Sequence, residues 1–115
     1  MLENKDWSVR MNEAYNPSTS ATLLKKLASD ESENVRFAVA CNRNTPADLL
    51  EKLANDEDGD VRAAVAENQN TPVALLEEFA EDEAPAVRAA VIERAKELAD
   101  TDFALYVTAI AKSYD

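Results

Sequence analysis

Residues 35–50 read VRFAVACNRNTPADLL, and residues 61–76 read VRAAVAENQNTPVALL. The second stretch repeats the first after twenty-six residues, with the Val-Arg pair, an Asn, the Thr-Pro pair and the Leu-Leu pair at matching places. The step continues in both directions, because Val-Arg pairs begin at Val9, Val35, Val61 and Val87. A fixed period of this length is typical of proteins built from stacked copies of one small structural unit.

Each unit is predicted to contain a short first helix. Thr45 is expected to be its N-cap and Pro46 its first residue, a place where the missing amide hydrogen has no partner to lose. The apolar residues that follow form one stripe at helical spacing. They are Leu49, Leu50, Leu53 and Ala54.

A second helix is predicted to carry the Val-Arg pair. Pro85 suits the first position of the last such helix, which places the four N-caps at Asp6, Ser32, Asp58 and Ala84. Val61, Ala64 and Val65 supply its buried face. Asn tolerates the left-handed conformation that ends many helices, and the register places one at Asn16, Asn42 and Asn68. Arg94 replaces Asn in the last unit, so that helix is expected to run on toward Ala99.

Helices of about ten residues are unstable alone, and stacking the units buries their apolar stripes. The sequence therefore predicts one all-α solenoid of two-helix repeats over residues 1–115. The predicted parts are an N-terminal cap unit (1–18), three full repeats (19–44, 45–70 and 71–96) and a C-terminal capping helix (97–115) that starts near Asp100 or Thr101.

Composition argues against several classes of function. The net charge of −11 repels a phosphate backbone, so nucleic acid is not an expected partner. The chain has no His and one Cys, which disfavours common acid–base and metal chemistry, and no cofactor is expected. The N-terminus lacks the apolar stretch of a signal peptide, and no apolar run is long enough to span a membrane, so we expect a cytoplasmic protein.

The motif V-R-x-A-V-A-x-N followed by T-P-x-x-L-L resembles the leucine-rich repeat variant family of short bacterial helical repeats. It is carried by Val35–Asn42 and Thr45–Leu50 and by their copies, over roughly residues 6 to 96. The resemblance implies a right-handed superhelix related to HEAT and armadillo arrays, a role as an interaction scaffold, and no catalytic residues. Some relatives carry a cysteine-clustered iron–sulfur module, which a chain whose one cysteine is Cys41 cannot form.

Charged residues also follow the period. The arginines are Arg10, Arg36, Arg62 and Arg88, and the aspartates, each six residues before an arginine, are Asp30, Asp56 and Asp82. This spacing resembles the Asp/Arg ladder of HEAT repeats, and we interpret it as a structural ladder between units. The alternative is a cationic track for an anionic ligand. The acidic run Asp56–Asp60 lacks the glycine position of a calcium loop, so no metal site is predicted there.

One surface departs from the repeat. Met11, Tyr15, Phe37 and Cys41 are expected on the outer face of the second helices, where later units have Ala63, Glu67, Ala89 and Glu93. We interpret them as an apolar patch beside an acidic flank that includes Glu67 and Glu93. The alternative is that Phe37 folds against its neighbours as part of the core. The segment 45–70 has a net charge of −5, whereas 19–44 has +1.

These observations predict a monomeric, non-enzymatic protein–protein interaction module whose partner carries a basic segment. Two alternatives stay open. The chain can be the docking domain of a longer protein, or a HEAT-like protein that processes a ligand or a nucleic acid.

The repeat makes a direct spectroscopic prediction. Because all predicted elements are helices linked by short loops, the far-UV circular dichroism spectrum should show the helical double minimum and no β signature. Substantial β content in that spectrum would contradict the assignment.

Overall fold

The computed structural model describes residues 6–98, and within that range the chain forms seven helices and no strand. The predicted all-helical class is confirmed for this part of the chain. The helices are α1 (Trp7–Tyr15), α2 (Ala21–Leu27), α3 (Glu33–Cys41), α4 (Ala47–Leu53), α5 (Gly59–Glu67), α6 (Val73–Phe79) and α7 (Pro85–Glu97). The predicted capping helix from Asp100 or Thr101 onward lies outside the described residues.

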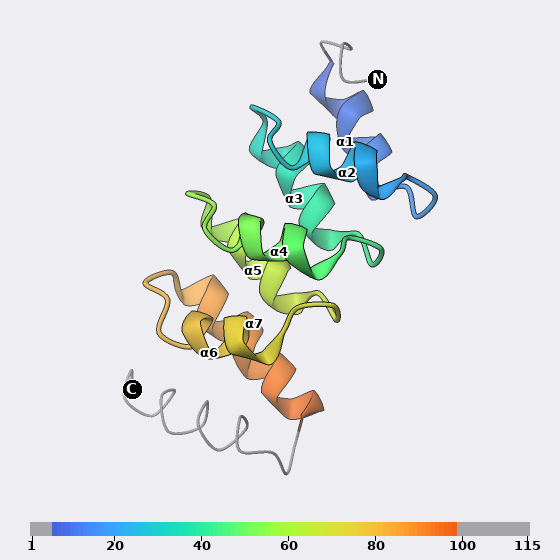
Figure 1. Ribbon diagram of the computed structural model, residues 1–115. Helices are drawn as coiled ribbons and strands as arrows, with labels where there is room; N and C mark the ends of the chain where they lie inside the picture. Colours follow the sequence, from blue (N-terminus) through green and yellow to red (C-terminus); the bar gives the residue numbers. More distant parts are fainter. Residues whose placement is uncertain (1–5, 99–115) are drawn as a thin grey trace.

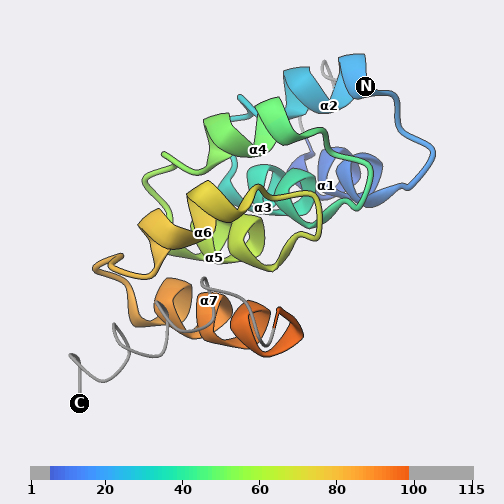
Figure 2. The ribbon, with the colours of Figure 1, turned by 60° about the horizontal axis from the view of Figure 1, so that its bottom comes forward.

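The helices form two layers (Figures 1 and 2). The odd layer consists of α1, α3, α5 and α7, which lie side by side in chain order. The even layer consists of α2, α4 and α6, and each of these helices packs on the two odd helices that flank it in sequence. Most contacts between units are made by successive helices of the odd layer, and the result is an elongated molecule of 46 × 23 × 17 Å.

The core lies between the two layers and is made of the residues that recur in each unit. From the odd layer, Val35, Val61 and Val87 are fully buried, and from the even layer Leu24, Leu50 and Leu76 are fully buried. Burying one such side chain contributes about 1.5–3 kcal/mol. Helices of seven to thirteen residues depend on this burial, because nucleating a short helix in water is unfavourable.

The odd helices begin where the sequence predicts. Asp6, Ser32 and Asp58 occupy the N-cap positions, and the side chain of each accepts a hydrogen bond from a backbone amide of the first turn. Ala84 occupies the same position in α7 without a capping side chain, and Pro85 follows at the first helical residue. The N-cap positions of these four helices are therefore confirmed.

The predicted role of Thr45 as N-cap is wrong. The N-cap position of α4 is Pro46, and no side chain caps this helix. The buried hydroxyl of Thr45 instead donates to the carbonyl oxygen of Val39, at 2.7 Å, and Thr19 and Thr71 make the equivalent bond to Glu13 and Val65. Each of these carbonyls belongs to the last turn of an odd helix and also accepts the backbone amide of the Asn that ends that helix. The threonines thus tie each odd helix to the even helix that follows it.

The prediction that asparagines in the left-handed conformation end the odd helices is also wrong. Asn16, Asn42 and Asn68 end their helices in extended conformation, with φ between −65° and −73°. The side-chain amide of Asn42 donates to the carbonyl oxygens of Ala14 and Asn16, and that of Asn68 donates to those of Ala40 and Asn42. These buried amides satisfy the ends of the preceding odd helix, so each one joins two units.

The last odd helix differs, as Arg94 predicted. Helix α7 has thirteen residues, whereas α1, α3 and α5 have nine each. Arg94 is buried, and its Nη1 donates to the carbonyl oxygen of Asn68 at 2.7 Å. A longer side chain therefore makes the bond between units that Asn42 and Asn68 make elsewhere, while the helix backbone continues past it.

The Arg–Asp ladder links each unit to the next through the side chains of Arg10, Arg36 and Arg62. Nε of Arg62 donates to Asp82 at 3.0 Å and Nη2 donates at 3.1 Å, and Arg10 and Arg36 make the same pair of bonds to Asp30 and Asp56. Each aspartate lies twenty residues after its arginine. The six-residue spacing seen in the sequence is used differently, since Nη1 of Arg62 donates to the backbone carbonyl of Asp56.

These pairs are shielded from solvent. The Arg62 and Asp82 side chains are both 13% exposed. Burial by itself would raise the pKa of Asp82, but the hydrogen bond from Arg62 and one from the Ala84 amide outweigh it and hold that pKa below its ordinary value of 3.8. The bidentate bond to Asp82 in turn raises the pKa of Arg62. The opposite charges make each bond stronger than one between neutral groups, and the two-pronged geometry fixes the orientation of both side chains.

Loss of one rung should therefore destabilise the protein. Arg62→Ala removes the bidentate bond to Asp82 and leaves the carbonyls of Asp56 and Glu57 without their donor, so the free energy of unfolding should fall by about 1–3 kcal/mol. Urea unfolding measures this change. Lys52→Ala is the control, because the exposed Lys52 bonds only the exposed hydroxyl of Ser29. Equal unfolding midpoints for the two variants would contradict a structural role for the ladder.

Candidate functional site

The outer face of the odd layer carries four residues at one register position, one on each helix. Tyr15 is 42% exposed, and Cys41, Glu67 and Glu93 are exposed as well. Desolvation raises the pKa of the Tyr15 phenol, and the negative charge of a Cys41 thiolate raises that pKa further. These residues therefore form a row across the stack that is apolar on α1 and α3 and acidic on α5 and α7.

The other two residues of the predicted patch are less accessible. Met11 and Phe37 are half-buried and pack against the core. Part of the side chain of Phe37 thus belongs to the interior, as the alternative interpretation expected, and part of it faces solvent. Met11 and Phe37 each precede a residue of the exposed row, Tyr15 or Cys41, by four positions, so each lies on the same side of its helix as that residue.

A hollow of about 310 Å³ opens beside Phe37 on this face. It is lined by Glu33, Asn34 and Phe37 of α3 and by Asp58 and Asp60 at the start of α5. Asp58 is already engaged, since its carboxylate accepts the amides of Asp60 and Val61. The sequence analysis missed Glu33 and Asp60 as site residues, because they belong to different units and only the packing of α3 against α5 brings them together.

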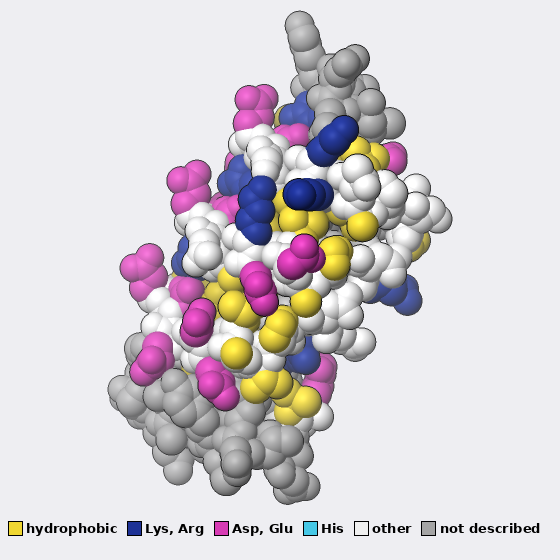
Figure 3. All heavy atoms as spheres, viewed as in Figure 1, with side chains coloured by type: hydrophobic (Ala, Val, Ile, Leu, Met, Phe, Trp, Pro, Cys, Tyr) yellow, Lys and Arg dark blue, Asp and Glu magenta, His cyan; other side chains and the backbone are white. Residues whose placement is uncertain are grey.

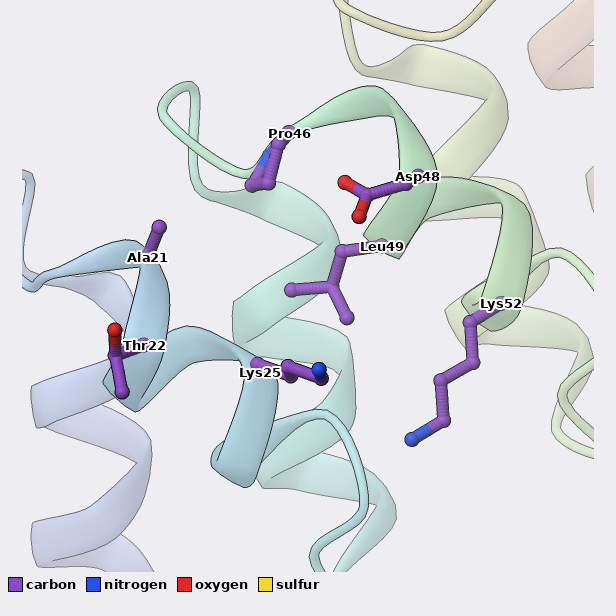
Figure 4. Close-up of a pocket in the computed structure, with 7 residues that line it drawn as sticks. All are labelled: Ala21, Thr22, Lys25, Pro46, Asp48, Leu49 and Lys52. Atoms are coloured by element: carbon purple, nitrogen blue, oxygen red, sulfur yellow. The ribbon is translucent and has the colours of Figure 1, made fainter.

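The even layer presents a different surface (Figure 3). Basic side chains gather around α2, acidic side chains lie over α4 and α6, and hydrophobic side chains run between them. A groove of about 290 Å³ lies between α2 and α4, lined by Ala21, Thr22, Lys25, Pro46, Asp48, Leu49 and Lys52 (Figure 4). The sequence analysis singled out none of these residues for binding. The sequence does carry a signal for this groove, because Glu51 and Glu78 stand twenty-six residues after Lys25 and Lys52.

Two kinds of site do not occur in the described residues. Within residues 6–98, no group of three or more His, Cys, Asp or Glu side chains is arranged to hold a metal ion. Over the same residues, none of the helices has the length and apolar character needed to cross a membrane.

Comparison with known proteins identifies the family. A model of the leucine-rich repeat variant domain matches residues 37–95, which is just over half of the chain. The chain belongs to the leucine-rich repeat variant family. The motif-based prediction of this family is therefore confirmed. No curated protein and no solved structure matches the chain.

In this leucine-rich repeat variant protein the matched span begins at Phe37 and ends within α7, so it contains Lys52 and the acidic end of the exposed row but neither Tyr15 nor Lys25. The family match covers the repeated interior. The residues that distinguish α1 and α2 from later units lie outside it.

The arginines of the ladder are engaged within this fold. Arg10, Arg36 and Arg62 bind aspartates of the next unit, and Arg88 donates to the carbonyl oxygens of Asp82 and Glu83. An anionic ligand would have to displace these bonds. The geometry thus favours the structural interpretation over the cationic track.

Cys41 has the properties of an unreactive thiol. Desolvation by the atoms around it, and then the negative charge of Glu67, raise the pKa of Cys41 from 9.0 to about 11, although the residue as a whole is exposed. The thiolate is the nucleophilic form of cysteine, and a pKa of about 11 leaves the Cys41 thiol almost fully protonated at neutral pH. A thiol with this raised pKa is a weak nucleophile at neutral pH.

Alkylation should reveal this raised pKa. At about pH 8, iodoacetamide should react with Cys41 at least about tenfold more slowly than with a free cysteine peptide, because so little thiolate is present. The rate should keep rising with pH beyond the point where the peptide levels off, and Glu67→Gln should increase it. A rate that levels off near the ordinary pKa of cysteine would contradict the assignment.

Proposed function

We propose that this protein is a non-enzymatic protein–protein interaction module that binds a basic segment of its partner on the outer face of the odd layer. The observation that carries the proposal is the hollow beside Phe37. The acidic residues Glu33, Asp58 and Asp60 line it together with Phe37, whose half-buried side chain packs against the core. A lysine or arginine side chain fits such a site, because its aliphatic stem packs on the ring while its charge lies among the carboxylates.

The exposed row supports the same partner. Tyr15 and Cys41 offer apolar contact area at the C-terminal ends of α1 and α3, and Glu67 and Glu93 extend the acidic surface along the stack. Aromatic anchors supply much of the binding energy at protein interfaces, whereas charges at the rim mainly steer association. The net charge of −5 in residues 45–70 adds to that steering.

A break in the symmetry between the units also supports a binding role for the outer face. The interior repeats the same residues from unit to unit, while the outer face changes from Met11, Tyr15, Phe37 and Cys41 to alanines and glutamates.

We further propose that the 26-residue units form a right-handed superhelix, as the family resemblance implies, and that the protein acts as a cytoplasmic monomer without a cofactor. The lack of any His and the raised pKa of Cys41 argue against catalysis.

A double variant tests the apolar part of this surface. Tyr15→Ala/Phe37→Ala should lower the affinity for a partner recovered by pull-down from the native lysate by about tenfold or more, since both aromatic anchors are lost. Circular dichroism must first show intact helicity, because Phe37 is half-buried. Unchanged affinity with intact helicity would rule the patch out, and unfolding would assign these side chains to the core.

The acidic part has a matched control in the same assay. Glu33→Gln/Asp60→Asn neutralises two walls of the hollow and spares the N-cap Asp58, so affinity and its salt dependence should both fall. Glu77→Gln/Glu78→Gln changes the net charge equally on exposed positions of α6 and should have little effect. Equal losses in the two variants would show that only the overall charge matters.

A further inference from the structure

The groove between α2 and α4 is lined by two lysines, although the chain as a whole is acidic. Lys25 lies on its α2 side, and Lys52 extends from α4 toward α2 (Figure 4). Lys25, Lys26 and Lys52 all belong to these two helices, whereas Lys96 belongs to α7 and pairs with Glu93. Of the four lysines within residues 6–98 of this acidic protein, three therefore belong to α2 and α4, and two of these, Lys25 and Lys52, line the groove.

The repeat makes this concentration significant. Twenty-six residues after Lys25 and Lys52 the sequence has Glu51 and Glu78. The same two wall positions therefore carry two cations at the α2–α4 step and two anions at the α4–α6 step. Because the units share their buried residues, the core does not require this change of sign, which concerns exposed side chains alone.

The groove floor is apolar. Leu49 points from α4 into the space between the helices, with Ala21 on the opposite wall and Pro46 toward one end (Figure 4). Asp48 lies toward the Pro46 end, away from the Lys52 ammonium. An occupant thus meets an aliphatic surface in the middle of the groove and positive charge at one end of it.

We propose that the α2–α4 groove is a docking site for a protein segment in which an acidic residue stands next to an aliphatic one. The aliphatic side chain packs on Leu49, and the carboxylate lies between the ammonium groups of Lys25 and Lys52. Charge complementarity identifies this occupant, because the two lysines attract an acidic residue and repel a basic one. The site is separate from the hollow beside Phe37, which is in the other layer and has the opposite charge preference.

The negative net charge does not prevent this binding at physiological salt. At about 0.15 M ionic strength the screening length is about 8 Å, so the lysines that line the groove outweigh acidic residues farther along the stack. The acids Glu51 and Glu78 at the next step then confine an acidic segment to the α2–α4 end of the even layer.

Two labelled peptides test the proposal. The acidic probe is a glycine-flanked repeat of Leu-Glu, and the basic probe is the same peptide with Lys in place of Glu. Fluorescence anisotropy at about 0.15 M salt should show the wild-type protein binding the acidic probe at least about tenfold more tightly than a Lys25→Glu/Lys52→Glu variant does. That variant should instead gain affinity for the basic probe, a reversal that mere loss of structure cannot produce.

Matched variants complete the test. Arg43→Glu/Lys96→Glu makes the same change in net charge at exposed positions outside the groove and should keep the wild-type affinity for the acidic probe within about twofold. Lys25→Gln/Lys52→Gln removes the two positive charges from the last turns of α2 and α4 without adding negative ones. It should weaken the affinity for the acidic probe without creating a preference for the basic probe. Glu33→Gln/Asp60→Asn should leave it unchanged, which separates this site from the odd-layer surface. The proposal is overturned if the charge-reversed groove keeps its preference for the acidic probe, or if the Arg43/Lys96 control loses as much affinity.

Discussion

The structure depends on one constraint, which is that the short helices of residues 6–98 need a neighbouring unit to bury their apolar stripes. Helices of seven to thirteen residues gain too little from their own hydrogen bonds to persist in water. Val35, Val61 and Val87 become fully buried only because successive odd helices lie side by side and an even helix covers each junction. Folding of one unit is therefore coupled to folding of the next, as in other repeat proteins.

Polar side chains determine how the units sit on one another. Arg62 reaches Asp82, and Asn68 reaches the carbonyl oxygens of Ala40 and Asn42 in the preceding unit. A slip of one residue would leave these buried donors and acceptors unpaired, at a cost of about 1–3 kcal/mol each. Apolar burial supplies most of the stabilisation, and the polar bonds select one register. That register in turn aligns Tyr15, Cys41, Glu67 and Glu93 into a row.

Surface positions are free of this constraint, and the chain uses that freedom differently on its two layers. On the odd layer an aromatic ring stands among carboxylates, and on the even layer lysines flank an apolar groove. The two sites are assembled the same way, from side chains of two consecutive helices of one layer. Each is therefore a property of the stack rather than of any single unit.

Sequence alone determined the helical class, the family and the N-caps Asp6, Ser32 and Asp58, because periodicity and capping depend on residues close together in the chain. It also indicated which valines and leucines are buried. Only the tertiary structure decided that Thr45 ties α3 to α4, that Asn42 bridges two units, and that each ladder arginine binds an aspartate twenty residues later. Thr and Asn suit a local cap and a distant carbonyl equally well. Which role they take, and which charged residues meet in a hollow or a groove, depends on the atoms that stacking brings within hydrogen-bonding distance.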